Sequence, residues 1–278
     1  MRLRIAHSTT YRYEPAATGI TQILRLTPRN HDGQYVADWQ IDVSAESRIH
    51  LRQDAFGNIT HVLTEGTIAD LTVTVEGLIE THDTGGVLRG SDERFPPSLF
   101  LRTTPLTGVN AAMEAFSSEL RSESEKDVLG FLHALMLQIN DHMTFDEDPT
   151  NTGTSAVEAF ALKRGVCQDY AHIFIACARS VGVPSRFVAG HFLRSDGMVN
   201  QQAGHAWAEA FVPNLGWVAF DPANAICTTD AHARVALGLD YLGAAPVRGT
   251  RYGGGTETLT VAVKVDQAGR QGQWQSQS

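Results

Sequence analysis

Three residues that lie far apart in the sequence could together perform nucleophilic chemistry: Cys167, His205 and Asp221. A cysteine thiolate is a nucleophile, a histidine can take and return a proton, and a carboxylate can hold the histidine ring in one tautomer. Each residue alone has a commoner structural role, as a buried cysteine, a packed histidine or a turn-forming aspartate. Their joint presence predicts attack on an acyl carbon if the fold brings them together.

The segment that follows Cys167 is predicted to be a buried helix, because apolar residues repeat at helical spacing. These residues are Tyr170, Ile173, Phe174, Cys177 and Val181. Gly182 and Pro184 end the pattern. Cys167 is therefore expected at the positive end of a helix, which favours the thiolate and offers free N–H groups to an oxyanion. We expect Gly165 to adopt a backbone conformation closed to other residues and so to allow a sharp entry into the helix.

A β-hairpin is predicted downstream of this helix, because two aromatic and apolar runs are separated by turn residues. The runs are 205–212 and 216–221, and the loop between them is 213–215. With a three-residue loop, Val212 lies opposite Gly216. A loop of two or four residues would turn one strand's side chains to the other face of the sheet.

This register decides whether the histidine and the carboxylate can meet. With the three-residue loop, His205 and Asp221 are diagonal neighbours on one face of the hairpin. Glu209 lies on the same face as His205 and is the alternative partner for its ring. Trp207 and Trp217 could wall a channel that excludes water.

Three short motifs carry a resemblance to a known family. They are GVCQDYAH at 165–172, GHAWAE at 204–209 and GWVAFDP at 216–222. In these motifs the chain resembles the transglutaminase-like superfamily, which is similar to papain in placing its cysteine on a helix and its histidine and aspartate on adjacent strands. The resemblance implies that Cys167 is the nucleophile, that His205 is the general base and acid, and that Asp221 is the orienting carboxylate.

The resemblance extends to a bacterial subgroup with an N-terminal β-domain, because the DAFGN pattern at 54–58 is similar to that domain's. The motifs also contain four candidate supporting residues: Gln168, Asp169, Trp207 and Glu209. Nothing in the motifs carries over the calcium dependence of animal transglutaminases.

The activity implied by the resemblance is acyl transfer through a thioester on peptide or side-chain amide bonds. We expect water to resolve the thioester, as in a protease or amidase, because no amine-binding site can be recognised in the sequence. The alternative is a protein-glutamine transglutaminase that uses an amine acceptor. A second alternative is a non-catalytic binding module on the same fold.

The resemblance implies a peptide or protein amide substrate as the partner, and composition argues against nucleic acid and a membrane. The chain has 278 residues and a net charge of −9, which argues against nucleic acid. It has no apolar run long enough to cross a membrane, and its first residues lack the apolar run of a signal peptide. Three cysteines make no disulfide framework, so a reducing cytoplasm is expected. No HExxH motif or zinc-spaced cluster occurs, so we expect no metal and no cofactor. The oligomeric state is left open.

The pattern of elements predicts an α+β protein with two domains. Short alternating strands favour a β-sandwich-like N-terminal domain over 1–95, with a linker rich in Gly, Asp and Pro at 81–97. Helices followed by an antiparallel sheet are predicted over 96–266, and the resemblance makes this region a papain-like, transglutaminase-like catalytic domain. The tail, 267–278, is rich in Gln, Ser and Gly and is expected to be disordered.

Several local features are also predicted. An apolar stripe indicates a helix from Glu125 to about Met143. Ser155 and Glu158 have the spacing of a capping box. His172 and Cys177 lie on the cysteine helix, but we interpret both as packing residues: the first points away from Cys167, and the second lies in the apolar part of the helix.

Overall fold

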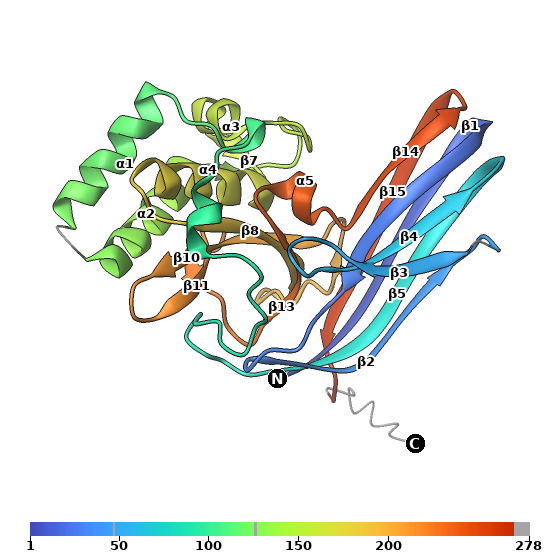
Figure 1. The fold of residues 1–278 in the computed structure, drawn as a ribbon, viewed down its shortest axis with the longest axis horizontal. Coiled ribbons are helices and arrows are strands. Elements are labelled where there is room, and N and C mark those ends of the chain that lie inside the picture. The colour runs from blue at the N-terminus through green and yellow to red at the C-terminus, as the bar shows by residue number, and fades with distance from the viewer. Residues whose placement is uncertain (47, 125–126, 270–278) are drawn as a thin grey trace, which may run out of the picture.

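The computed structural model describes residues 1–46, 48–124 and 127–269, and these form two large sheets with helices packed on the second (Figure 1). The fold is α+β, as predicted. The first sheet has eight strands: β1 (Arg2–Thr27), β2 (Gln34–Val43), β3 (Ile49–Gln53), β4 (Ile59–Glu65), β5 (Ile68–Thr81), β9 (Asn200–Gln201), β14 (Val247–Gly253) and β15 (Thr256–Gln267).

The long strand β1 organises this sheet. Its first half pairs with β5 on one side and β15 on the other, and its second half pairs with β4 and β14. Buried and exposed side chains alternate along β1, as expected of a strand with one buried face. The buried residues of β1, β4 and β5 form one cluster, so the curled sheet packs upon itself in a sandwich-like manner.

Both ends of the chain therefore contribute to the first sheet. Strands β14 and β15 follow the helical region in sequence, yet Val263 of β15 lies opposite His7 of β1. The domain bounds predicted from the sequence put these strands in the catalytic domain at 96–266. Their pairing with β1 places them in the N-terminal sheet. Where the domains begin and end stays a prediction. Of the tail predicted to be disordered, Gln267 ends β15, 268–269 form a turn, and 270–278 lie outside the described residues.

The predicted linker is not a free connection between the two parts. Thr81 still belongs to β5, and the chain then packs along the outer strand of the hairpin. The backbone N–H of Leu88 donates to Trp217 O at 2.9 Å, and Ala219 N–H donates to Gly86 O at 2.9 Å. Two short 3₁₀ helices follow, Pro97–Leu101 and Pro105–Thr107. This segment therefore pairs with β11 (Gly216–Asp221), and its Phe95 and Phe100 pack in one apolar cluster with Trp217.

Four helices and one short turn of helix make up the helical layer. They are α1 (Ala111–Glu123), α2 (Val128–His142), α3 (Ala156–Leu162), α4 (Cys167–Ser180) and α5 (Tyr241–Ala244). The predicted helix from Glu125 corresponds to α2, although 125–126 lie outside the described residues. The capping box is confirmed: Glu158 N–H donates to Ser155 Oγ at 3.3 Å, and Ser155 N–H donates to Glu158 Oε2 at 2.8 Å. Helix α1 was not predicted.

The second sheet is antiparallel with the order β12-β11-β10-β8-β13. Its strands are β8 (Ser185–Phe192), β10 (His205–Val212), β11 (Gly216–Asp221), β12 (Ile226–Cys227) and β13 (His232–Gly238). Helix α4 packs across β10 and β8 (Figure 1). Small alanines on β10 and an almost wholly buried α4 permit this close contact, and α1, α2 and α3 surround the helix.

A two-stranded parallel pair lies just before α4. It joins β6 (Thr144–Phe145) to β7 (Arg164–Gly165). This pair ties the loop after α2 to the residues that lead into Cys167. None of the helices in the described part of the chain has the length and apolar character needed to span a bilayer.

Candidate active site

Cys167 is the first residue of α4, as predicted, and its side chain is partly exposed. Asp169 fixes this end of the helix. Its Oδ2 accepts the backbone N–H of Val166 at 2.8 Å and the Thr150 hydroxyl at 2.7 Å. Because the first N–H groups of a helix have no acceptor within the helix, the N–H of Cys167 is available to an oxyanion beside the sulfur.

The need for glycine at 165 has a different cause from the predicted one. Gly165 does not have a positive φ. A Cβ built at this position would lie 2.4 Å from Asp169 Oδ2 and 2.9 Å from Asp169 Cβ. The position therefore requires glycine because the capping carboxylate occupies the space, not because of its backbone angles. The other end of the helix follows the prediction, since Gly182 has φ +81°.

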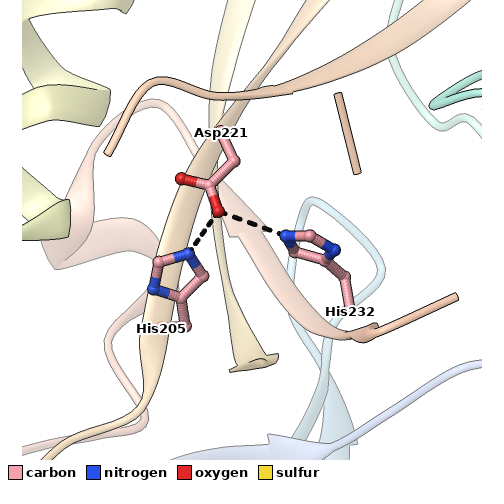
Figure 2. A group of neighbouring side chains, drawn as sticks. All are labelled: His205, Asp221 and His232. Atoms are coloured by element: carbon pink, nitrogen blue, oxygen red, sulfur yellow. Dashed lines mark hydrogen bonds and ion pairs between the residues drawn. The ribbon is translucent and has the colours of Figure 1, made fainter. Parts of the chain in front are cut away.

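The hairpin has the predicted register. Val212 lies opposite Gly216 across a loop of three residues, and the pairing continues to Ala208 opposite Phe220. Continuing this register by one residue sets Trp207 opposite Asp221, so His205 is the diagonal neighbour of Asp221, and its Nε2 lies 2.6 Å from Asp221 Oδ2. The structure therefore brings together the histidine and the carboxylate that the sequence paired (Figure 2).

The charges around His205 favour its protonated form. Burial acts to lower the pKa of His205, but the carboxylate of Asp221 and the thiolate of Cys167 outweigh burial and raise it to about 10. Burial likewise acts to raise the pKa of Asp221, but the two histidines beside it hold that pKa well below its usual range. His205 uses Nε2 for Asp221, which leaves Nδ1 for a second partner. Cys167, His205 and Asp221 thus form one electrostatically coupled group.

Asp221 has two further hydrogen-bond donors that the sequence analysis did not identify. Asn224 Nδ2 donates to Asp221 Oδ2 at 2.7 Å. His232 Nε2 lies 3.1 Å from the same oxygen and approaches it from another side than His205 (Figure 2). Asp221 itself is fully buried. Asn224 follows Asp221 by three residues, so an Asx-type turn could have been predicted, but His232 comes from β13, which has no sequence signal linking it to the site.

His205, Asp221 and His232 also have the composition of a metal-binding group, with ligand atoms within 4.8 Å of one another. Their hydrogen bonds argue against metal ligation. The backbone N–H of Thr229 donates to His232 Nδ1 at 3.1 Å, which places the ring proton of neutral His232 on Nε2. A protonated Nε2 has no lone pair for a metal, so we assign this nitrogen to the hydrogen bond with Asp221.

Glu209, the alternative carboxylate, is engaged elsewhere. Its Oε2 accepts Arg186 Nε at 2.6 Å and its Oε1 accepts Arg234 Nε at 2.7 Å. Burial acts to raise the pKa of Glu209, but the two arginines lower it to about 2. Arg186 also binds Glu93 and lies over the ring of Trp217 at 3.9 Å. Glu209 therefore links β8 and β13 through two arginines, and Asp221 is the carboxylate that meets His205.

The remaining candidate supporting residues are buried. Gln168 and Asp169 lie in the first turn of α4. Trp207 and Trp217 belong to an apolar cluster with Phe100. Trp207 borders a cavity of about 40 Å³.

His172 and Cys177 on α4 are packing residues, as predicted. His172 is fully buried and its Nε2 accepts the backbone N–H of Tyr241 at 3.0 Å. Cys177 is buried in the core, where burial raises the pKa of its thiol to about 12. Tyr241 was not identified from the sequence as part of the site: burial and the nearby Cys167 both raise the pKa of its phenol.

Comparison with known proteins agrees with this arrangement. Residues 114–222 match the family model of the transglutaminase-like superfamily, and residues 3–80 match that of the bacterial transglutaminase-like N-terminal region. The first match contains Cys167, His205 and Asp221. A solved structure from Cytophaga hutchinsonii, named as a candidate cysteine protease, has the same fold, with a TM-score of 0.75 at 19% identity over 96% of this chain and 90% of that chain.

Two curated relatives illustrate the range of similarity. An uncharacterized protein of Mycobacterium leprae is 28% identical over 285 residues, which cover 95% of this chain and 98% of the relative. A protein-glutamine gamma-glutamyltransferase of Pseudomonas aeruginosa is 30% identical over 167 residues, which cover 54% of this chain but only 24% of that protein. Similarity to the first relative therefore includes both parts of the chain.

Proposed function

This chain belongs to the transglutaminase-like superfamily, and on that basis we propose that it is an acyl-transfer enzyme with Cys167 as its nucleophile. The observation that carries the proposal is the hydrogen bond of 2.6 Å from His205 to the buried Asp221, combined with the electrostatic coupling of His205 to Cys167. A cysteine at a helix start, beside a histidine held by a carboxylate, has the parts needed for nucleophilic catalysis.

In the proposed reaction the Cys167 thiolate attacks the carbonyl carbon of an amide. The oxygen becomes negatively charged beside the N–H group at the start of α4, which stabilises it. His205 gives its proton to the leaving amine as the C–N bond breaks, and a thioester remains on the sulfur. His205 then takes a proton from water, the resulting hydroxide attacks the thioester, and the thiolate leaves. Asp221 keeps the imidazole oriented throughout.

We propose hydrolysis rather than transamidation as the main outcome. Water is present at about 55 M, so an amine at millimolar concentration must be bound and oriented to compete with it. The tryptophans that could have formed a dry acceptor channel are packed in the apolar cluster. Trp207 also borders a cavity of about 40 Å³, which has room for a few water molecules.

A protein-glutamine transglutaminase is the second candidate. It is favoured by the similarity to the Pseudomonas aeruginosa protein-glutamine gamma-glutamyltransferase, whose aligned region covers about half of this chain. The same three residues serve both reactions, because only the acceptor that resolves the thioester differs. A peptide or protein amide is the proposed substrate in each case.

One experiment separates these functions. The purified chain is given a glutamine-containing peptide together with a primary amine at millimolar concentration. Mass spectrometry then counts cleaved or deamidated peptide and amine adduct. Cleaved or deamidated peptide in excess, absent in Cys167→Ala, supports a hydrolase. An excess of adduct supports a transglutaminase, and no Cys167-dependent product from a panel of peptides indicates a binding module.

A further inference from the structure

The Asp221 carboxylate carries a second histidine whose role the reaction described above does not include. His232 begins β13, and its side chain is 2% exposed. Its Nε2 lies 3.1 Å from Asp221 Oδ2, the oxygen that also accepts His205 at 2.6 Å. Three donors, counting the amide of Asn224, therefore converge on one oxygen atom.

Hydrogen bonding determines which way the His232 proton points. The backbone N–H of Thr229 occupies the lone pair of His232 Nδ1 at 3.1 Å, so the neutral ring must carry its proton on Nε2. Nε2–H then donates to Asp221. The ring cannot turn freely, because Phe192 lies against it with centroids 4.5 Å apart and Trp207 meets it edge-on at 5.4 Å. His232 is therefore a fixed donor.

The charge of His232 is also controlled. Burial lowers its pKa, and this outweighs the nearby carboxylate. Ionisable groups on the neighbouring elements are Asp221 and His205, together with the residues that share the cavity beside the ring: His31, His82, Glu209 and Arg234. A neutral donor stabilises the carboxylate without adding a positive charge that would compete with protonated His205.

We propose that His232 is a positioning residue that fixes the Asp221 carboxylate and, through it, the ring of His205. This inference rests on the proposed function for its catalytic consequence. A carboxylate held by His232 and Asn224 cannot rotate away from His205, so the imidazole keeps Nε2 on Asp221 and Nδ1 free for the Cys167 thiol. Without the His232 donor, the carboxylate holds protonated His205 less well, and the thiolate loses part of its counter-charge.

Two substitutions that differ by one methylene group test the proposal. In His232→Gln the side-chain amide can reach the place of Nε2 and donate to Asp221, whereas in His232→Asn it is too short. The measurement is the alkylation rate of Cys167 by iodoacetamide between pH 5 and 10, which needs no knowledge of the substrate. We expect the midpoint of thiolate formation to rise by about one pH unit in His232→Asn, with a roughly tenfold slower reaction at pH values below the wild-type midpoint, the scale of losing one hydrogen bond to a charged group. We expect His232→Gln to stay near wild type.

A purely structural role would lower the melting temperature of both variants and leave the midpoint of both unchanged, and that result would overturn the proposal. An NMR measurement on the wild-type protein tests the tautomer without any variant. The ¹⁵N shifts of His232 are expected to show a neutral ring protonated on Nε2 at pH 7, because its pKa lies below the ordinary 6.5. A proton on Nδ1, or titration near pH 6.5, would refute the assignment. Both measurements are independent of turnover, so a failure of the proposed acyl transfer is distinguishable from a failure of this inference.

Discussion

Replacement of Asp221 by asparagine isolates the charge of the orienting carboxylate. Asparagine has nearly the same shape, and its amide oxygen can still accept the three donors that meet Asp221 Oδ2. The geometry should therefore survive while the negative charge is lost. The expected result is a large fall in turnover with little change in the fold.

The magnitude follows from the electrostatics of His205. Its pKa of about 10 lies about 3.5 pH units above the ordinary 6.5, which corresponds to about 5 kcal/mol at 1.36 kcal/mol per pH unit. Two groups raise this pKa, and Asp221 is the stronger. If half of the net effect belongs to Asp221, Asp221→Asn removes about 2.5 kcal/mol of stabilisation of protonated His205, which corresponds to a roughly 10²-fold fall in turnover. This is smaller than the loss of about 10⁴ for the equivalent change in a serine triad.

The assay has two readouts. The first is kcat/KM for an amide substrate, compared between wild type and Asp221→Asn, with a thermal melt to confirm folding. The second is the titration of the His205 ring by NMR, which should move down by nearly two pH units. If Asp221→Asn stays within threefold of wild type while Glu209→Gln is inactive, Glu209 is the functional carboxylate and the reasoning from the hairpin register is refuted.

The same pKa predicts how stability changes with pH. Because protonated His205 is favoured in the folded state, its contribution to the free energy of unfolding is complete below about pH 6.5. That contribution should be lost as the pH rises towards 10. Chemical denaturation of the wild type should show this decline, and Asp221→Asn should show a smaller one. An equal decline in both proteins would show that another group is responsible.

Three further substitutions or modifications test other parts of the structure. Iodoacetamide at pH 7 should label Cys167 well before Cys177, whose buried thiol has its pKa raised to about 12, and peptide mass spectrometry of partly labelled protein would reveal the opposite order. Gly165→Ala should destabilise the fold by about 1–3 kcal/mol, because its Cβ would lie 2.4 Å from the capping carboxylate of Asp169; an unchanged urea midpoint would contradict this. Glu209→Gln should cost about 3 kcal/mol, because the buried Arg186 and the half-buried Arg234 lose the carboxylate between them, but the titration of the active-site histidine should not move.

The sequence by itself determined the local elements that hold the three candidate catalytic residues. Helical periodicity placed Cys167 at the start of α4, and the three turn residues after Val212 set the register that joins His205 to Asp221. These features depend on neighbours within about twenty residues. The spacing of apolar residues, the helix-capping residues and the length of a hairpin loop can be read directly from a sequence.

Only the tertiary structure decided the surroundings of these residues. His232 reaches Asp221 from β13, and β15 returns to pair with the first strand of the chain. The sequence places both Glu209 and Asp221 on the hairpin face of His205. In the structure, Arg186 and Arg234 form ion pairs with Glu209, because β8 and β13 bring their side chains to it. The sequence carries no local signal for such contacts, because they depend on which strands become neighbours after long connections have closed.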